Sequence, residues 1–476
     1  MAKTRQLVWF RTDIRAEDNK ALYQASQAGD VVGVYLIQPG QWANHDDSPN
    51  KLFFSLSCVA SLQQRLAKLN IPLLVKEAVY YSDSAELLLN LARSLECQGI
   101  WFNDEYGVNE QNRDRKVIEA FDAAGLSSHR FTDAVLVEPG RVMTGKGEAF
   151  KVFTPFKKAV YRHLRPEDWM PCPSPSKQTS LDIASDPVPV DRYTPTASNI
   201  LERWEPDEAS AHKCLNDFIE SRVQRYAEQR DFPALDGTSS LSPWLVAGVL
   251  SIRQCFDAAV CANNGELDSG NAGITCWLGE LVWREFYKHI LVAFPRVSMH
   301  RPFQVETDKL SWRHDSALQE AWESGKTGFP LVDAAMRQLV ATGWMHNRLR
   351  MVTAMFLSKN LMLDWRIGER FFMRHLVDGD LAANNGGWQW SASTGTDAAP
   401  YFRMFNPVSQ SEKFDPDGTF IRTWVPELAA LDNKAIHQPL KGKTGDLFGA
   451  LDYPAPIVDH SASRQRVIEA FKGLRS

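Results

Sequence analysis

The stretch VVGVYLI, at Val31–Ile37, decides the fold class of the first third of the chain. An unbroken apolar run of this length is typical of a strand that is buried on both faces of a sheet. Three further short runs resemble it, at Leu7–Phe10, Pro72–Val75 and Gly99–Asn103. Amphipathic helical patterns lie between them, for example at Leu52–Leu69 and Ser84–Glu96. Strands that alternate with helices predict a parallel sheet with helices on both faces, a Rossmann-like α/β domain.

The composition changes after this region. Seven prolines stand among polar residues between Pro166 and Pro195, which indicates a linker. From about Glu202 the apolar spacing becomes helical, as in the set Leu215, Phe218, Ile219, Val223 and Tyr226. We therefore expect an α/β domain at residues 1–135, an interdomain linker at 136–201 and an all-helical domain at 202–476.

Start and stop signals locate several helices of the C-terminal domain. Pro243 stands at the first helical position after Ser242, and Ser251 with Gln254 resembles a capping box. The strongest helical patterns are Cys276–Phe294, Pro330–Thr342, Asn347–Leu361 and, near the end of the chain, Ser463–Leu474.

Length and composition exclude several classes of protein. The 476 residues suggest more than one domain, and 44% hydrophobic with 23% charged residues is ordinary for a soluble protein. The net charge of −5 argues against a wholly basic nucleic-acid coat but not against a local basic patch. Seven scattered cysteines without metal-ligand spacing suggest reduced thiols and no metal site. No signal peptide or transmembrane stretch is visible, so we expect a cytoplasmic protein, assuming a bacterial source.

Two GKT triplets raise the question of a phosphate-binding loop. They lie at Gly325–Thr327 and at residues 442–444. Each lacks the earlier glycine that such a loop needs, because Glu320 and His437 occupy that place. Ordinary loop glycines explain both triplets better.

Two segments of the helical domain have unusual compositions. Arg230–Pro233 is followed by GTSSLS at 237–242, where hydroxyls and free backbone N–H groups suit a phosphate, although N-capping alone also explains them. In Trp277–Tyr287 one helix face carries Glu280, Trp283, Arg284 and Tyr287. That face suits a stacked base with a hydrogen-bonding carboxyl, whereas an exposed Glu280–Arg284 ion pair is the plainer alternative.

Two later segments are equally unusual. Gly343–Met351 places Asn347 and Met351 one helical turn apart, and its arginines could meet phosphates. His346 in this segment more often has a structural role, and none is assigned to it. Asp378–Trp390 gathers two acids, two amides, two glycines and two tryptophans in thirteen residues. Acids and amides can bind ribityl hydroxyls and a polar ring edge, and glycines allow a ligand to approach the backbone.

These four segments, in this order, resemble the class I photolyase/cryptochrome family, with bacterial folate-type cyclobutane pyrimidine dimer photolyases as the nearest group. The resemblance covers nearly the whole chain and is weakest in the linker and the last fifty residues. It extends through Leu7–Arg11, Val152–Phe156, Asp364–Arg366 and Asn406-Pro407.

The resemblance implies FAD in the helical domain, fully reduced in the active state. By motif match its ligands would be Tyr226, Thr238, Ser239, Leu241, Ser242, Trp277, Arg284, Asn347, Arg350, Asp378 and Asp380, with Asn384 facing flavin N5. The tryptophans Trp388, Trp365 and Trp312 match the family's electron chain for photoreducing FAD, although ordinary core aromatics are the alternative.

The implied reaction is light-driven electron transfer from reduced FAD to a pyrimidine dimer flipped out of DNA. Glu280 would hydrogen-bond the pyrimidine edge and stabilise its radical anion. The pocket would be lined by Trp283, Trp390, Asn347 and Met351, with Arg230, Arg348 and Arg403 as contacts to DNA.

A second chromophore is implied at the N-terminal domain. Asn109 and Glu110 match the family's folate-binding pair, and Phe150–Phe156 has a folate-type context. Where such relatives usually carry Lys, this chain reads Ser298-Met299, which weakens a folate contact. The expected antenna is 5,10-methenyltetrahydrofolate, with a deazaflavin or no second chromophore as alternatives.

Two features favour repair of cyclobutane dimers within the family. Photolyases for (6-4) lesions carry His where Asn347 and Met351 stand, and signalling cryptochromes usually have a long C-terminal extension. A cryptochrome-type blue-light photoreceptor is the alternative function, and a generic nucleotide-binding protein leaves the Trp-rich motifs unexplained. The expected partner is damaged DNA. The protein is expected to be a monomer without a membrane or obligate protein partner, and nucleoid-associated when bound to DNA.

Overall fold

The computed structural model describes residues 4–440 and 452–474. The chain forms two compact units. The first unit comprises Met1–Pro195, Asn199–Gln224 and Ser239–Pro295, and the second comprises Thr196–Ser198, Arg225–Thr238 and Arg296–Ser476. Residues 196–198 and 225–238 belong to the second unit although they lie between segments of the first. Each unit is therefore built from several segments of the chain. The second GKT triplet, at 442–444, lies outside the described residues.

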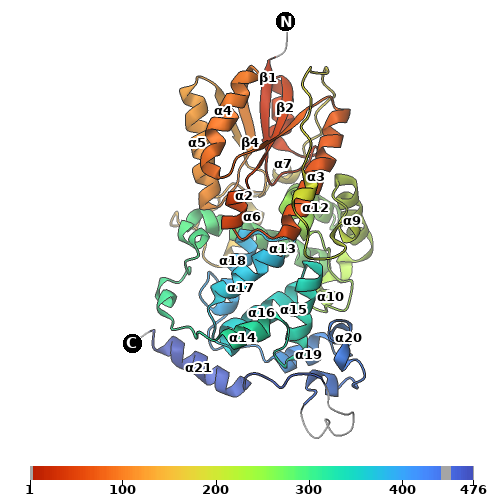
Figure 1. Cartoon of the computed structure of the whole chain (residues 1–476), viewed down its shortest axis with the longest axis vertical. Coiled ribbons are helices and arrows are strands. Elements are labelled where there is room, and N and C mark those ends of the chain that lie inside the picture. The colour runs from red at the N-terminus through yellow and green to blue at the C-terminus, as the bar shows by residue number, and fades with distance from the viewer. Residues whose placement is uncertain (1–3, 441–451, 475–476) are drawn as a thin grey trace. The chain divides into compact units, whose positions relative to one another are not determined.

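The first unit contains a five-stranded parallel sheet in the order β3-β2-β1-β4-β5 (Figure 1). Its strands are β1 Arg5–Phe10, β2 Asp30–Ile37, β3 Leu73–Glu77, β4 Cys97–Asn103 and β5 Ser127–Phe131. The first four confirm the sequence prediction to within two residues at each end. Strand β5 was not predicted, because at the edge of the sheet it is mostly polar and only half-buried.

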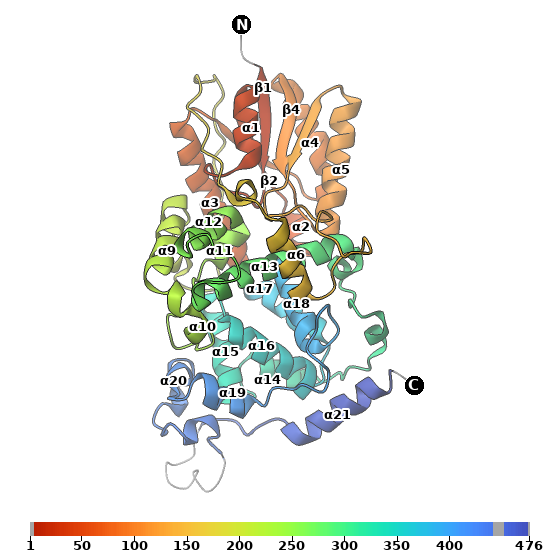
Figure 2. The same ribbon diagram turned by 180° about the vertical axis from the view of Figure 1, so that it is seen from behind.

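Helices cover both faces of this sheet (Figure 2). On one face α4 (Ser84–Ser94) and α5 (Val108–Ala123) pack on Leu7, Trp9 and Val34. Because parallel crossovers are right-handed, the reversal of strand order after β3 places α1 (Lys20–Ala28) and α3 (Pro49–Lys68) on the opposite face. The Rossmann-like α/β fold is thereby confirmed.

The first unit also contains α2 (Pro39–Asn44) and helices from the middle of the chain. The latter are α6 (Phe153–His163), α7 (Pro166–Trp169), α8 (Ile200–Arg203), α9 (Glu208–Ser221), α11 (Ser242–Ala247), α12 (Ile252–Ala262) and α13 (Ala272–Ala293). Residues 136–201 thus include α6, α7 and the start of α8. The helical spacing through Tyr226 was wrong in one respect, because α9 ends at Ser221 and a separate 3-10 turn follows. Pro243 occupies the second position of α11, since the helix begins at Ser242.

A buried cluster of charges connects α12 to the α/β part of the first unit. Arg253 lies 2.6 Å from Asp133 and 3.0 Å from Asp18, and Arg15 lies 2.6 Å from Asp133. Each of these four side chains is at most 3% exposed. The predicted capping box of Ser251 and Gln254 starts α12 beside this cluster. The two arginines and the two aspartates neutralise one another, which is how charges are retained in a low-dielectric interior.

The second unit is helical. It comprises α10 (Tyr226–Gln229), α14 (Ser316–Glu323), α15 (Pro330–Thr342), α16 (Asn347–Met355), η6 (Phe356–Asn360), α17 (Trp365–His375), α18 (Leu381–Ala392), α19 (Pro407–Phe414), α20 (Thr419–Trp424) and α21 (His460–Lys472). Helix α15 has the bounds that its Pro and the following Gly343 predicted. The pattern at Asn347–Leu361 is one helix followed by a π turn, η6.

No helix in the ranges 4–440 and 452–474 is long and apolar enough to cross a membrane. All seven cysteines are free. Within the same ranges there is also no group of three His, Cys, Asp or Glu side chains that could hold a metal ion.

Candidate functional site

The predicted polar-aromatic face of α13 lies in the first unit. The ring of Trp283 stacks on Phe153 at 3.7 Å with an interplanar angle of 9°, and its next aromatic neighbour is Tyr287 at 5.6 Å. Arg284 donates to the carbonyl oxygens of Ala134, at 2.6 Å, and Leu245, at 3.4 Å. The guanidinium therefore fastens α13 to two other segments of the unit. Glu280 is half-buried on the same face, one turn before it.

The hydroxyl-rich segment is held by its backbone. The carbonyl oxygen of Ser240 accepts from the indole of Trp204 at 3.0 Å, and that of Ser239 accepts from the thiol of Cys214 at 3.6 Å. Ser240 has φ 52°, in the left-handed region. Leu241 is buried, whereas the side chains of Ser239 and Ser242 are partly exposed. The backbone of this loop is thus held in place, and its serine side chains are partly exposed at the start of α11.

In the second unit, His346 caps α16. Its Nδ1 accepts from the backbone N–H of Arg348 at 3.2 Å, and burial lowers the pKa of the ring to about 4. The imidazole is therefore neutral at pH 7, which agrees with the structural role favoured from the sequence. Asn347 is exposed and Met351 half-buried one turn later.

Arginines of α16 meet carboxylates from other segments of the second unit. Arg348 lies 2.7 Å from Asp231 and 4.6 Å from the ring centre of Phe414, and Arg230 is 3.9 Å from the same Asp231. Arg350 contacts both oxygens of Asp378, at 2.7 and 3.0 Å. The structure thus brings Arg230 and Arg348 together at Asp231, and it pairs Arg350 with Asp378. Tyr226 lies under Arg230, 5.2 Å from its guanidinium carbon.

Helix α18 carries the most distinctive predicted residues. Asp380 caps it by accepting from the N–H of Ala383. The Asn384 amide donates to the backbone oxygen of Glu369 at 3.0 Å, while the Asn385 amide donates to the Glu369 carboxylate at 2.7 Å. The other carboxylate oxygen is 3.2 Å from His300. Sequence reasoning missed Glu369 and His300, because only the fold brings α17 and residue 300 beside α18.

Two of the three predicted chain tryptophans belong to one buried core in the second unit. Trp365 and Trp388 are 1% and 2% exposed, and Trp312 packs partly buried against that core. A Cβ on Gly368 would lie 2.0 Å from the Trp388 ring, so only glycine lets α17 approach it. Trp322, which was not singled out, meets Trp388 edge-on at 6.0 Å. The indole N–H of Trp388 is buried without a hydrogen-bond partner among the described residues.

The predicted antenna pair lies in a small polar cluster of the first unit. His45 is 2.9 Å from the Asn109 amide and 3.7 Å from the Glu110 carboxylate, and the Tyr81 hydroxyl donates to Glu110 at 3.2 Å. A Cβ on Gly107 would lie 2.1 Å from Glu110 Oε2, so glycine allows this carboxylate to fold back over the start of α5. His45 and Tyr81 were missed because they come from other segments, the residue that follows α2 and the 3-10 turn before α4.

The loop that carries Arg403 rests on a buried lysine. Lys359, in the π turn η6, is 1% exposed, and its ammonium donates to the carbonyl oxygens of Arg403 at 2.8 Å and Pro400 at 3.5 Å. Burial, and next the charge of Arg403, lowers the pKa of Lys359 to about 7. The loop exposes Phe402 and Arg403. A π turn inside a helix is frequently associated with a functional site.

We expect the pH profile of stability to identify this lysine. Because the ordinary lysine pKa is about 10.4, the unfolded chain binds more protons than the folded chain between pH 7 and 10, so stability rises with pH there. In urea unfolding, the stability advantage of wild type over Lys359→Met should therefore be larger at pH 9 than at pH 6.5, by roughly 1–2 kcal/mol. Parallel profiles for the two proteins would contradict the lowered pKa.

The donor set on α16 and α18 fits a flavin nucleotide. Arg350 and Asp378 form a neutral pair, the Asn384 amide is fixed by one bond, and a buried indole lies on the same helix. Such a set offers fixed donors and acceptors to a polar ring edge with little net charge, and supplies an oxidisable aromatic ring.

Comparisons with known proteins identify the family. Residues 6–176 match a family model described as DNA photolyase, and residues 277–473 match one described as the FAD binding domain of DNA photolyase. Deoxyribodipyrimidine photo-lyases of Salmonella typhimurium and Escherichia coli are 44% and 45% identical over 98% and 99% of both chains. The chain belongs to the DNA photolyase family. It is an FAD-binding lyase with the α/β and helical domains of that fold.

Solved structures of photolyases and cryptochromes have the same fold as this chain. A crystal structure of a class III photolyase from Agrobacterium tumefaciens has a TM-score of 0.91 at 34% identity, covering 100% of this chain and 98% of that one. A cryptochrome from Synechocystis has a TM-score of 0.86 at 28% identity, with 99% of each chain covered. The fold is thus shared by a photolyase and by a cryptochrome, and the choice between the two functions depends on the chemistry of the residues.

Proposed function

We propose that the protein is a deoxyribodipyrimidine photo-lyase that uses blue or near-UV light to split cyclobutane pyrimidine dimers in DNA. The full-length identity of 44–45% to enzymes of that name carries this proposal. Bound FAD in its fully reduced form supplies the electron on illumination. The chain's own residues hold that cofactor, admit the lesion and exclude water from it.

The residues that would hold the cofactor are those that match the family's motifs. They are Tyr226, Thr238, Ser239, Leu241, Ser242, Trp277, Arg284, Asn347, Arg350, Asp378, Asp380 and Asn384. The Asn384 amide nitrogen is already committed to the Glu369 carbonyl. Its Oδ1 is therefore the atom that would accept from a protonated N5, the form that reduced flavin carries.

The lesion would contact aromatic and polar side chains. Trp283 and Trp390 would wall the flipped dimer, Asn347 and Met351 would line it, and Glu280 would hydrogen-bond the pyrimidine edge. Arg230, Arg348 and Arg403 would contact the DNA. Repair of a (6-4) lesion needs proton transfer, and neither an exposed amide nor a thioether at 347 and 351 supplies a general acid. Cyclobutane dimers are therefore the favoured substrate.

The remaining parts of the proposal concern the antenna and the cell. We infer that Asn109 and Glu110 contact 5,10-methenyltetrahydrofolate, and His45 and Tyr81 would orient them. The domains would be divided at 135/136 and 201/202. The protein would act as a cytoplasmic monomer that joins the nucleoid when it binds damaged DNA.

One experiment tests the function directly. An oligonucleotide with a single thymine cyclobutane dimer is incubated with photoreduced protein in blue light and in darkness. Repair only in light is expected. If FAD is bound and reduced yet the dimer persists, the enzyme proposal fails in favour of a (6-4) substrate or of a photoreceptor similar to the Synechocystis cryptochrome.

We expect Glu280→Ala to lower the repair yield more than FAD binding. A hydrogen bond to a charged group contributes about 1.5–3 kcal/mol, so the yield should fall by about tenfold or more. Repair yield per absorbed photon and the FAD content of purified protein are the two measurements. Glu86→Ala, which removes an exposed carboxylate on α4, is the control and should match wild type. An equal loss of FAD and repair would remove the role given to Glu280.

A further inference from the structure

The loop that carries Arg403 is a tight turn in the second unit. The backbone N–H of Arg403 donates to the carbonyl oxygen of Pro400 at 2.8 Å, which closes a β-turn with Tyr401 and Phe402 at its two central positions. The turn exposes the side chains of Phe402 and Arg403, whereas Tyr401 is half-buried. Because so short a turn makes few contacts of its own, the orientation of Arg403 depends on the groups that hold the turn in place.

A buried cation holds both ends of this turn. The ammonium of Lys359, in η6, donates to the carbonyl oxygens of Pro400 and Arg403, the first and last residues of the turn. Lys359 is 1% exposed. Burying an ammonium costs free energy unless it is hydrogen-bonded, and an apolar side chain would fill the same space without that cost. The contacts with the turn therefore explain why a lysine stands at this position.

The C-terminal helix α21 supports the same turn (Figure 1). The ring of Tyr401 stacks on Phe471 of α21, with ring centres 5.3 Å apart and an interplanar angle of 7°. The helix is itself anchored to η6. The Asn360 amide lies 3.1 Å from Nδ1 of His460, and the Asn360 carbonyl oxygen accepts from the Ser463 hydroxyl at 2.9 Å. Because Asn360 directly follows the buried lysine, η6 connects the turn and α21.

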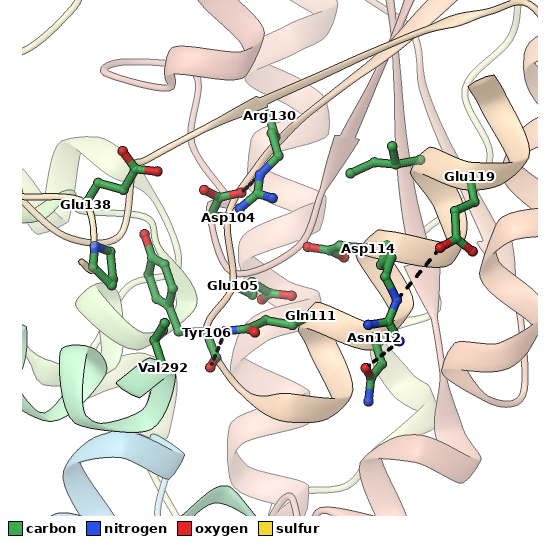
Figure 3. A pocket seen from close by; sticks show the side chains of 13 residues that line it. Asp104, Glu105, Tyr106, Gln111, Asn112, Asp114, Glu119, Arg130, Glu138 and Val292 are labelled. Atoms are coloured by element: carbon green, nitrogen blue, oxygen red, sulfur yellow. Dashed lines mark hydrogen bonds and ion pairs between the residues drawn. The ribbon is translucent and has the colours of Figure 1, made fainter. Parts of the chain in front are cut away.

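The two cations at this turn have no carboxylate partner within residues 4–440 and 452–474. Arg403 is close enough to Lys359 that its charge, after burial, contributes to the lowered pKa of the lysine. Other exposed arginines of the chain are paired, as Arg130 is with Asp104 at 2.8 Å (Figure 3). An exposed guanidinium beside a second, uncompensated cation favours an anion, and the anion that DNA offers is its phosphate.

We propose that Lys359 and Phe471 are positioning residues for DNA binding, which hold the turn so that Arg403 meets a DNA phosphate. The inference rests on the proposed function, because it takes damaged DNA as the ligand. Lys359 fixes the backbone of Arg403 itself, and Phe471 fixes the ring of Tyr401, two residues earlier. The affinity for DNA therefore depends on two side chains that do not touch it, one of them in a helix near the end of the chain.

A double-mutant cycle in the full-length, FAD-loaded protein tests this role. The probe is an oligonucleotide with one thymine cyclobutane dimer, and its binding in darkness is measured at several salt concentrations. Arg403→Gln and Lys359→Met should each weaken binding about tenfold, because each removes hydrogen bonds made by a charged group. The double variant should bind no more weakly than Arg403→Gln alone, because an absent guanidinium cannot be misplaced. Each single variant should also lose about one phosphate contact from the salt dependence of binding.

Two further variants separate positioning from general damage. Phe471→Leu keeps an apolar side chain in α21 but loses the ring stacking, and it should weaken binding about threefold. Its effect should likewise vanish in the Arg403→Gln background. Lys326→Met removes an exposed lysine of the same unit, and any effect it has should add to that of Arg403→Gln. The FAD content of Lys359→Met, Phe471→Leu and Lys326→Met should equal that of wild type.

Two results would overturn the positioning role. One is additive losses of affinity from Lys359→Met and Arg403→Gln, and the other is an unchanged salt dependence in Lys359→Met. If Lys359→Met fails to bind FAD, the cycle is measured with Phe471→Leu, and additive losses there overturn the proposal. A wild-type protein that binds the dimer no better than undamaged DNA would instead contradict the proposed function, and the inference would fall with it.

Discussion

Trp388→Phe is expected to slow the photoreduction of oxidised FAD strongly while sparing repair. Trp388 lies on α18, one helical turn after Asn384, and is buried in a core with Trp365. Its indole N–H has no partner among the described residues, so no hydrogen bond is lost in the variant. Phenylalanine fills most of the space against Gly368 but is much harder to oxidise than tryptophan. The photoreduction rate should fall by at least roughly tenfold, since the protein's part in this step is to position an oxidisable group near the cofactor.

Two measurements separate this role from a packing role. Appearance of reduced FAD under blue light with an external reductant reports photoreduction, and dimer repair by chemically reduced protein reports catalysis. Trp42→Phe, which alters a half-buried tryptophan of α2 in the first unit, is the control and should behave as wild type in both. Unimpaired photoreduction in Trp388→Phe would remove it from the electron path. A fall in both activities would indicate damage to the core instead.

The elements that were predicted well carry their signals locally. Helix α15 begins at Pro330 and ends before Gly343, and both residues act through their own backbone geometry. Strand β2 is buried on both faces and reads as an unbroken apolar run. Strand β5 has no such signal, because an edge strand with polar residues at 127–130 looks like a loop. The π turn η6 was not predicted either, because it follows α16 without a break and differs from an α-helix only in its hydrogen bonding.

The residues of the candidate site also fall into those with a local sequence signal and those without one. Residues in compact motifs, such as Asp378 to Trp390, were identified because their composition is unusual over a short stretch. Their supporting partners were not. Glu369 and His300 hold α18 through side chains that lie 16 and 85 residues away from Asn385, and only the fold reveals them.

The buried charge cluster is the clearest case of such long-range dependence, and it gives the second large expected effect. Arg253→Met should destabilise the protein by about 3–5 kcal/mol, because removing one partner of a buried ion pair leaves an uncompensated charge. Arg253 neutralises Asp18 and Asp133 at 3.0 and 2.6 Å, and all three are fully or almost fully buried. Methionine keeps the volume but supplies no donor. Urea unfolding followed by far-UV circular dichroism measures the change.

An exposed ion pair provides the matched control. Arg192 contacts both oxygens of Glu77, at 2.6 and 3.0 Å, yet both side chains are at least 36% exposed. Arg192→Met should therefore cost no more than about 1 kcal/mol, since solvent screens such pairs. Comparable losses in the two variants would show that burial does not set the strength of the cluster.

The pH dependence gives a second, independent test of the same cluster. Although burial alone would raise it, Arg15 and Arg253 hold the pKa of Asp133 well below its usual range. A carboxylate with a lowered folded pKa contributes stability above its unfolded pKa of about 3.9, and this contribution is lost as the pH falls toward the folded value. Wild type should therefore lose stability steeply below pH 4. Arg253→Met should lose less over the same range, because Asp133 then keeps only Arg15 and its pKa moves back toward the unfolded value.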